Sequence, residues 1–202
     1  MPTKVCFNDF CKKIPDLKEN IVNGSIKVIP LKKGKKAPRD NGWSKREYEL
    51  SELEKYDGNF GIMPGYNHET SSLAIIDIDG YTMNGVNADK KAYYKKATQE
   101  YLYNCLKEIP GAMAVRTQSG GYHIYLWNET VVDKVHETSN HLHFPEDFYI
   151  PELRGKSLKH SIEIFTKEGS KQCLLPGCII YDDATGKENT YSVISDVNTL
   201  SN

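Results

Sequence analysis

The feature that most constrains this fold is a period-two alternation at residues 75–80, which read Ile-Ile-Asp-Ile-Asp-Gly. Neighbouring side chains of a β-strand point to opposite faces, so Asp77 and Asp79 share one face while Ile76 and Ile78 enter the core. Two carboxylates a few ångströms apart repel by about 4 kcal/mol at an effective dielectric constant of 20. Oxygen ligands of this kind suit Mg²⁺ or Mn²⁺. Taken alone, however, such a pair is more often simply solvated.

Two further segments follow the same pattern. Residues 119–126 read Ser-Gly-Gly-Tyr-His-Ile-Tyr-Leu, and residues 161–165 read Ser-Ile-Glu-Ile-Phe. His123 and Glu163 each face away from the apolar residues beside them. Singly, each is more typical of an ordinary strand residue. Together, three acids and a phosphate-binding group are the minimum set for two-metal phosphoryl or nucleotidyl transfer.

The order of the remaining patterns predicts an α+β fold. A helix is expected over 87–109, because apolar or aromatic residues recur there at spacings of three and four, namely Tyr94, Ala97, Tyr101, Cys105 and Ile109. Pro110-Gly111 ends that helix. Residues 113–117 and 122–127 flank a turn and predict a hairpin. Short helices are expected at 7–13, at 16–22 and after Ser51 as N-cap, and further strands at 25–30, 73–78, 161–165, 172–175 and 179–181. This order favours an antiparallel-rich sheet with helices on one face.

Length and composition place the chain among globular proteins. Its 202 residues are 39% hydrophobic and 26% charged, which is enough for one core or two closely packed subdomains. No apolar run approaches the roughly 20 residues of a membrane span, and the N-terminus resembles no signal peptide, so a cytoplasmic location without membrane association is expected. The five cysteines form no disulfide pattern, and Cys173 and Cys178 lack the further ligands that a zinc site needs.

One segment is strongly basic although the net charge is only −1. Residues 32–39 carry five positive charges in eight positions. On composition alone this basic loop is more typical of a solvated surface than of a binding site. A polymerase remains compatible with the net charge, because local fields matter more than the total.

The ordered set of motifs resembles the archaeo-eukaryotic primase superfamily, specifically the primase-polymerase domains of archaeal plasmids, viruses and phages. Asp77-Ile78-Asp79, Gly121-Tyr122-His123 and Ile162-Glu163 are similar to its three motifs, in the same order. Upstream, the Ile-Pro strand at 29–30, the Lys-Pro loop at 34–38 with Trp43, and the Asn-Phe-Gly segment at 59–61 also resemble that family. Downstream, residues 174–177 resemble the strand and proline turn that close its site.

The resemblance implies one catalytic domain over residues 1–202, with an N-terminal α/β subdomain at about 1–70 and an RRM-like palm at about 71–202. It implies template-directed nucleotidyl transfer from dNTPs or NTPs on single-stranded DNA, with a primer, two Mg²⁺ or Mn²⁺ ions and no organic cofactor. Relatives often continue into a helicase, which makes the chain a candidate N-terminal part of a longer replication protein and a helicase domain or subunit a candidate partner. The implied metal ligands are Asp77, Asp79 and Glu163. The implied nucleotide contacts are His123, Ser119, Gly120, Gly121, Arg116 and Lys171, and the implied DNA contacts are Lys35, Lys36 and Arg39.

Two other functions remain open from the residues. His141-Leu142-His143 matches the His-hydrophobic-His metal motif of rolling-circle replication endonucleases, although it lies in a polar stretch without a clear strand pattern. A palm-like domain that binds nucleic acid without catalysis is the second alternative. The complete set of acids argues against a pure clamp, because three converging negative charges repel a phosphate backbone.

Overall fold

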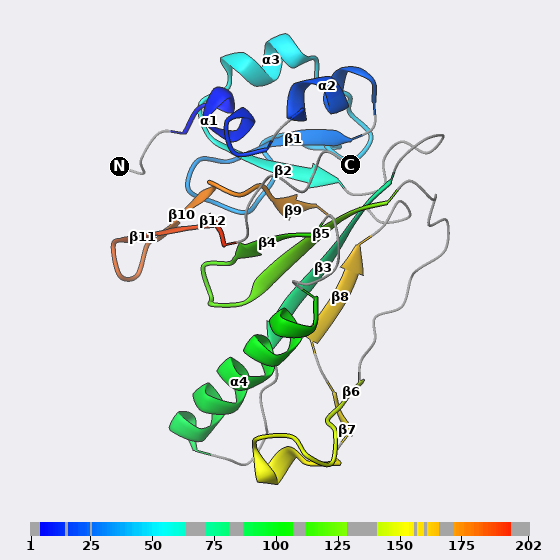
Figure 1. Cartoon of the computed structure of the whole chain (residues 1–202). Helices are drawn as coiled ribbons and strands as arrows, with labels where there is room; N and C mark the ends of the chain where they lie inside the picture. The colour runs from blue at the N-terminus through cyan, green and yellow to red at the C-terminus, as the bar shows by residue number, and fades with distance from the viewer. Residues whose placement is uncertain are drawn as a thin grey trace.

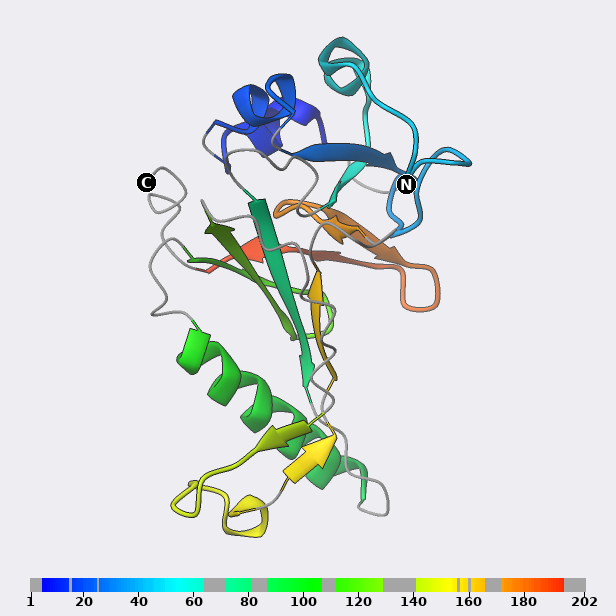
Figure 2. The ribbon, with the colours of Figure 1, turned by 90° about the vertical axis from the view of Figure 1, so that its right-hand side faces the viewer.

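The computed structural model describes residues 5–14, 16–24, 26–63, 72–80, 87–106, 112–128, 141–155, 157–159, 161–165 and 172–194. Within this part of the chain, no helix is both long and apolar enough to cross a membrane. The elements form an N-terminal lobe and a palm-like lobe, seen at the top and in the middle and bottom of Figures 1 and 2. The fold is α+β, as the sequence predicts.

The palm is built on a five-stranded sheet with the order β12-β4-β5-β3-β8, in which every neighbouring pair is antiparallel. Helix α4 links β3 to β4, and a tight turn links β4 to β5. The strands expected around residues 75, 115, 125 and 163 are all confirmed. The elements are β3 (Ser72–Gly80), α4 (Ala88–Leu106), β4 (Ala112–Arg116), β5 (Tyr122–Asn128), β8 (Ser161–Phe165) and β12 (Ser192–Val193).

One face of this sheet packs on α4. Ile78, Ala114 and Ile124 are fully buried there against Leu102 of the helix. These sheet residues are the alternate positions to the acids, so the period-two pattern predicted this face correctly. The helix begins after Asn87, whose side-chain oxygen accepts a hydrogen bond from the Lys90 amide at 2.9 Å. That bond caps the first turn of the helix.

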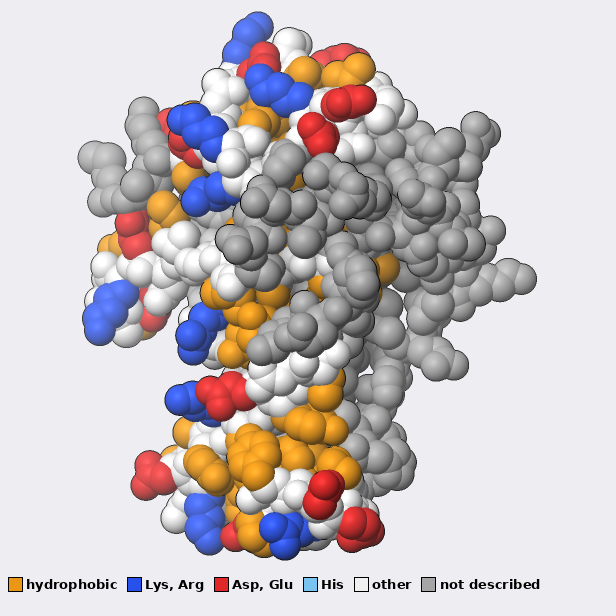
Figure 3. Space-filling view, viewed as in Figure 1, with side chains coloured by type: hydrophobic (Ala, Val, Ile, Leu, Met, Phe, Trp, Pro, Cys, Tyr) orange, Lys and Arg blue, Asp and Glu red, His pale blue; other side chains and the backbone are white. Residues whose placement is uncertain are grey.

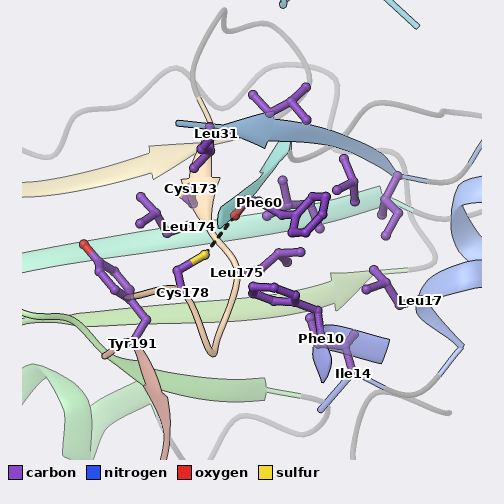
Figure 4. Close-up of a cluster of buried hydrophobic side chains, with 14 of the residues drawn as sticks. Phe10, Ile14, Leu17, Leu31, Phe60, Cys173, Leu174, Leu175, Cys178 and Tyr191 are labelled. Atoms are coloured by element: carbon purple, nitrogen blue, oxygen red, sulfur yellow. Dashed lines mark hydrogen bonds between the residues drawn. The ribbon is translucent and has the colours of Figure 1, made fainter. Parts of the chain in front are cut away.

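The N-terminal lobe covers the opposite face. Its sheet has the order β1-β2-β9, so its third strand comes from the C-terminal part of the chain. Figure 4 shows the core between the lobes. The rings of Phe10 and Phe60 pack edge to face there, with their centroids 5.1 Å apart, and Cys178 Sγ donates a hydrogen bond to Phe60 O at 3.1 Å. The elements are α1 (Phe7–Cys11), α2 (Leu17–Val22), β1 (Lys27–Leu31), α3 (Leu50–Lys55), β2 (Asn59–Met63) and β9 (Cys173–Leu174), beside the β10 (Ile179–Asp182) and β11 (Lys187–Thr190) hairpin.

A third hydrophobic cluster packs on the part of α4 that carries Tyr94 and Ala97. Phe144, Phe148 and Leu153 pack there on Tyr94 and Ala97 of the helix. Figure 3 shows hydrophobic side chains gathered at this lower end of the molecule. The segment carries the 3₁₀ turn η1 (Pro151–Leu153) between β6 (His141–His143) and β7 (Ser157–Lys159), which pair with each other.

Three local expectations are corrected. Ser51 lies inside α3 instead of capping it, because the helix begins at Leu50, two residues earlier than expected, with Glu49 as its N-cap. His141–His143 is a strand, although the polar sequence around it lacks a strand pattern; pairing with β7 supplies the hydrogen bonds. Cys105 is exposed, whereas Leu102 supplies the buried contact on that turn of α4.

Candidate active site

Asp77, His123 and Glu163 lie in one row across three neighbouring strands. Asp77 on β3 pairs directly with His123 on β5 and with Glu163 on β8. Residues directly opposite each other in antiparallel strands share a face and have Cβ atoms about 5 Å apart. The backbone register therefore brings the three motifs together on one face, as their alternation predicted.

β3 is irregular at Asp79. Ile78 pairs with Ile162 and Gly80 with Ser161, so Asp79 is the extra residue of a β-bulge. A bulge turns the side chains around it, and such features recur next to active sites. Gln99 of α4 fixes the bulge by donating to the Asp79 backbone carbonyl at 2.9 Å, and the Asp79 side chain is exposed.

The turn between β4 and β5 lies against the irregular part of β3, beside Ile78 and Asp79. Thr117 N donates to Gly121 O at 2.9 Å, which closes the turn, and Gly120 adopts a φ of +82° that favours glycine. A Cβ atom on Gly121 would lie 2.5 Å from Ile78 O and 3.5 Å from Asp79 Cα. Gly121 is therefore required by a close approach of two backbones, and it keeps the turn beside Asp79. Ser119 is exposed on this turn, with its hydroxyl 3.2 Å from that of Thr117.

His123 is a buried, neutral histidine. Burial, and next the positive charge of Lys36, lower its pKa to about 4. Its Nε2 lies 3.4 Å from Asp77 Oδ1, and the Asp77 side chain keeps 21% of its surface exposed. Since the imidazole is neutral, this contact is polar instead of a full ion pair. The buried His123 Nδ1 has no hydrogen-bond partner within the described residues.

Tyr191 forms the wall behind His123. Its ring centroid lies 5.5 Å from that of His123, and it is 2% exposed. Figure 4 shows Tyr191 at the edge of the hydrophobic core, with its hydroxyl pointing away from Phe10 and Leu17. Burial, followed by the negative charge of Asp77, raises the pKa of Tyr191. No local sequence pattern marks Tyr191 as part of the site, because only the return of the chain from β11 brings it next to β5.

The acid-bearing face is not an open platform. Ile75, Met113 and Tyr125 lie on it and are at most 2% exposed, because the N-terminal lobe packs on them. The Tyr125 hydroxyl donates to Leu174 O at 2.7 Å and so ties β5 to β9. A template strand lying across an open sheet face does not fit this arrangement, because buried residues of the N-terminal lobe pack on most of that face. The site instead lies where the N-terminal lobe stops covering the sheet.

The predicted basic residues have different environments. Lys35 pairs with Asp183, and Arg39 pairs with Asp40 at 2.7 Å and Glu52 at 2.6 Å. The Lys36 ammonium instead lies over the Tyr191 ring, 5.9 Å from its centroid. Arg116 is exposed, and by strand alternation it lies on the α4 side of the sheet, opposite His123. Lys171 lies outside the described residues.

The donor set fits hard divalent cations. Carboxylate oxygens of Asp77 and Asp79, with Glu163 in register beside them, are the ligands that Mg²⁺ and Mn²⁺ take when substrate phosphates complete the shell. Among the side chains that the structure describes, no three of His, Cys, Asp and Glu form a ready cluster. The side chain of Glu163 is outside that set, so the fit rests on the register and on the chemistry of the donors.

A comparison with protein families agrees with this geometry. The family model described as bifunctional DNA primase/polymerase, N-terminal (Prim-Pol) matches residues 19–201. Comparisons with curated proteins and with solved structures find no match. The matched range contains all three motifs of the row and the basic loop. The chain therefore belongs to the Prim-Pol family of bifunctional DNA primase/polymerase N-terminal domains.

Proposed function

We propose that this domain joins nucleotides on a single-stranded DNA template, by nucleotidyl transfer from (d)NTPs to a 3′-hydroxyl group. The observation that carries the proposal is the common register of Asp77, His123 and Glu163 on three neighbouring strands. Membership of the Prim-Pol family supports it independently. Convergence of acids with a histidine on one face suits a substrate that carries both phosphates and divalent cations.

In this proposal Asp77, Asp79 and Glu163 hold the divalent ions. When bound, the ions supply Lewis acidity, which lowers the pKa of the attacking hydroxyl and neutralises the pyrophosphate leaving group. His123 donates a hydrogen bond to a phosphate oxygen from the edge that faces Asp77. The turn at 117–121 approaches the phosphates with backbone amides, which glycine allows. Tyr191 and the N-terminal lobe keep the ring of His123 in one orientation and exclude water from behind it. Arg116 and Lys171 stay predictions as further phosphate contacts.

The test is incorporation of labelled nucleotides by the domain on single-stranded DNA, with and without a primer, in Mg²⁺ or Mn²⁺. Asp77→Asn and Glu163→Gln are expected to lower the rate at least a hundredfold, since each removes charge that the transition state needs. Asp89→Asn and Glu152→Gln are the matched controls, because both acids are exposed and lie outside the site. Full incorporation by either site variant would refute the assignment.

Two other outcomes would point to the alternatives. A covalent 5′-phosphotyrosine adduct on single-stranded DNA, without nucleotide incorporation, would favour a rolling-circle endonuclease. The His141–His143 strand belongs to the separate β6-β7 sheet and not to the sheet of the acid row, so the present proposal expects no such adduct. Binding of DNA and nucleotide without any chemistry would indicate a non-catalytic palm.

A further inference from the structure

The basic loop is a fixed hairpin, and most of its cations serve the fold. Lys33 pairs with Asp57 at 2.8 Å, Lys35 pairs with Asp183, and Arg39 joins the pair with Asp40 and Glu52. Each of these three cations is held by a carboxylate of the protein itself. Such pairs position the loop and leave little charge for a ligand.

Lys36 differs from these three cations. It is exposed, and no hydrogen bond or ion pair to a described residue is found for its ammonium group, which lies over the Tyr191 ring. Tyr191 in turn contacts His123, whose Nε2 faces Asp77. A continuous series of contacts therefore leads from the Lys36 ammonium to the acid row.

Hydrogen bonds to three consecutive backbone carbonyls of the basic loop fix the position of Lys36. Gly34 O accepts from Tyr181 N at 2.9 Å, Lys35 O from Asn59 Nδ2 at 3.2 Å, and Lys36 O from Gln172 Nε2 at 3.0 Å. All three donors belong to residues outside the loop. A loop clamped at three consecutive residues needs little ordering when a ligand binds, which favours affinity.

Gly61 makes room for the third clamp. A Cβ atom there would lie 2.9 Å from Gln172 Cδ and closer still to Gln172 Oε1. Any larger residue at 61 would displace the amide that holds Lys36 O. The Asn-x-Gly pattern at 59–61 thus has a physical reason, since Asn59 and Gly61 both fix the position of the basic loop.

We propose that Lys36 contacts the triphosphate of the incoming nucleotide beside His123, and that Asn59, Gly61 and Gln172 are positioning residues for Lys36. This inference rests on the proposed function and names a substrate contact within it. The first reason is charge: a triphosphate is strongly anionic and the acid row is also negative, so a cation is needed beside the phosphates. The second reason is position, because the Lys36 ammonium contacts Tyr191, which contacts His123. Lys36 thereby moves from the expected template contacts to the nucleotide contacts.

The experiment measures equilibrium binding of dATP and of deoxyadenosine to the full chain in Mg²⁺, by calorimetry, alongside binding of single-stranded DNA. Lys36→Ala is expected to weaken dATP binding about tenfold to a hundredfold, the range for one charge-assisted hydrogen bond. Lys36→Arg should keep most of the affinity. Lys33→Ala is the matched control and should change it less than about threefold, because its partly exposed pair with Asp57 contributes little. Gln172→Ala should reproduce part of the Lys36→Ala loss.

The outcomes separate this inference from the proposed function. If Lys36→Ala weakens DNA binding and spares dATP, or if Lys36→Ala and Lys33→Ala are equivalent, the inference is wrong. Absence of dATP binding by the unmodified chain would also overturn it. Lys36-dependent dATP binding without nucleotide incorporation would instead support the inference while the proposed chemistry fails.

Discussion

Replacing Asn59 with alanine is expected to lower the free energy of unfolding by about 3 kcal/mol. Asn59 is 1% exposed and spans the basic loop and β10. Its Nδ2 donates to Lys35 O at 3.2 Å and to Ile179 O at 2.7 Å, and its Oδ1 accepts from Ile179 N at 3.0 Å. Alanine would leave three backbone groups without these partners.

The magnitude follows from those three groups. A buried polar group that loses its partner costs about 1–3 kcal/mol. Lys35 and Ile179 are only partly buried, so water reaches some of the freed groups and the low end of the range applies to each. Three groups at about 1 kcal/mol each give the expected total.

Urea unfolding followed by far-ultraviolet circular dichroism measures this loss by linear extrapolation. Asn104→Ala is the matched control, since Asn104 is exposed on α4 and its replacement should change stability by less than about 0.5 kcal/mol. Amide exchange at Ile179 should also accelerate in Asn59→Ala alone. A loss below about 1 kcal/mol, or equal to that of the control, would refute the view that Asn59 clamps the basic loop.

Two further predictions concern the turn beside the acids and the Arg39 network. Gly121→Ala should destabilise the domain by about 1–3 kcal/mol and lower nucleotide incorporation per folded molecule, because its Cβ would push the turn away from Ile78 O and Asp79. Urea unfolding measures the loss of stability, and the incorporation assay measures the loss of activity. Unchanged activity would contradict the role given to this close approach. The hydrogen bond from Arg39, with weaker help from Tyr48, lowers the pKa of Asp40 in the folded state. A lowered acid pKa stabilises the fold above the unfolded pKa, near 4, and that contribution is lost as the pH falls through the folded pKa. Asp40→Asn should therefore show a shallower loss of unfolding free energy between pH 5 and pH 3 than the unmodified chain, whereas parallel curves would show that the pair adds no pH-dependent stability.

Much of the site was accessible from local sequence patterns. The alternation around Asp77, His123 and Glu163 assigned each residue to the face opposite its apolar neighbours, and the register of β3 with β5 and β8 confirms that they share one face. The turn residues of 118–121 predicted the β4-β5 hairpin, which the structure also has. Periodicity succeeds here because strand alternation and turn chemistry are decided within a few residues.

Other elements could not be found this way. β2 lies over residues 59–63, which are buried throughout and so show no alternation. The short β12 consists of two residues, and its pairing with β4 depends on the chain returning from the β10-β11 hairpin. The bulge at Asp79 likewise depends on how β8 meets β3. Each of these features is set by a partner that is distant in the sequence.

The sequence by itself determined the α+β class, the strands of the acid row and the shared face of its three motifs, because side-chain period and glycine turns are local properties. Only the tertiary structure decided that the N-terminal lobe covers most of that face, that Tyr191 backs His123, and that Lys36 differs from Lys35 in what it contacts. The physical reason is that burial and ion pairing depend on which distant segments meet. In this chain, β9 pairs with β2, and the side chains of Asn59 and Gln172 donate hydrogen bonds to the backbone of the basic loop. These long-range contacts decide which segments lie together.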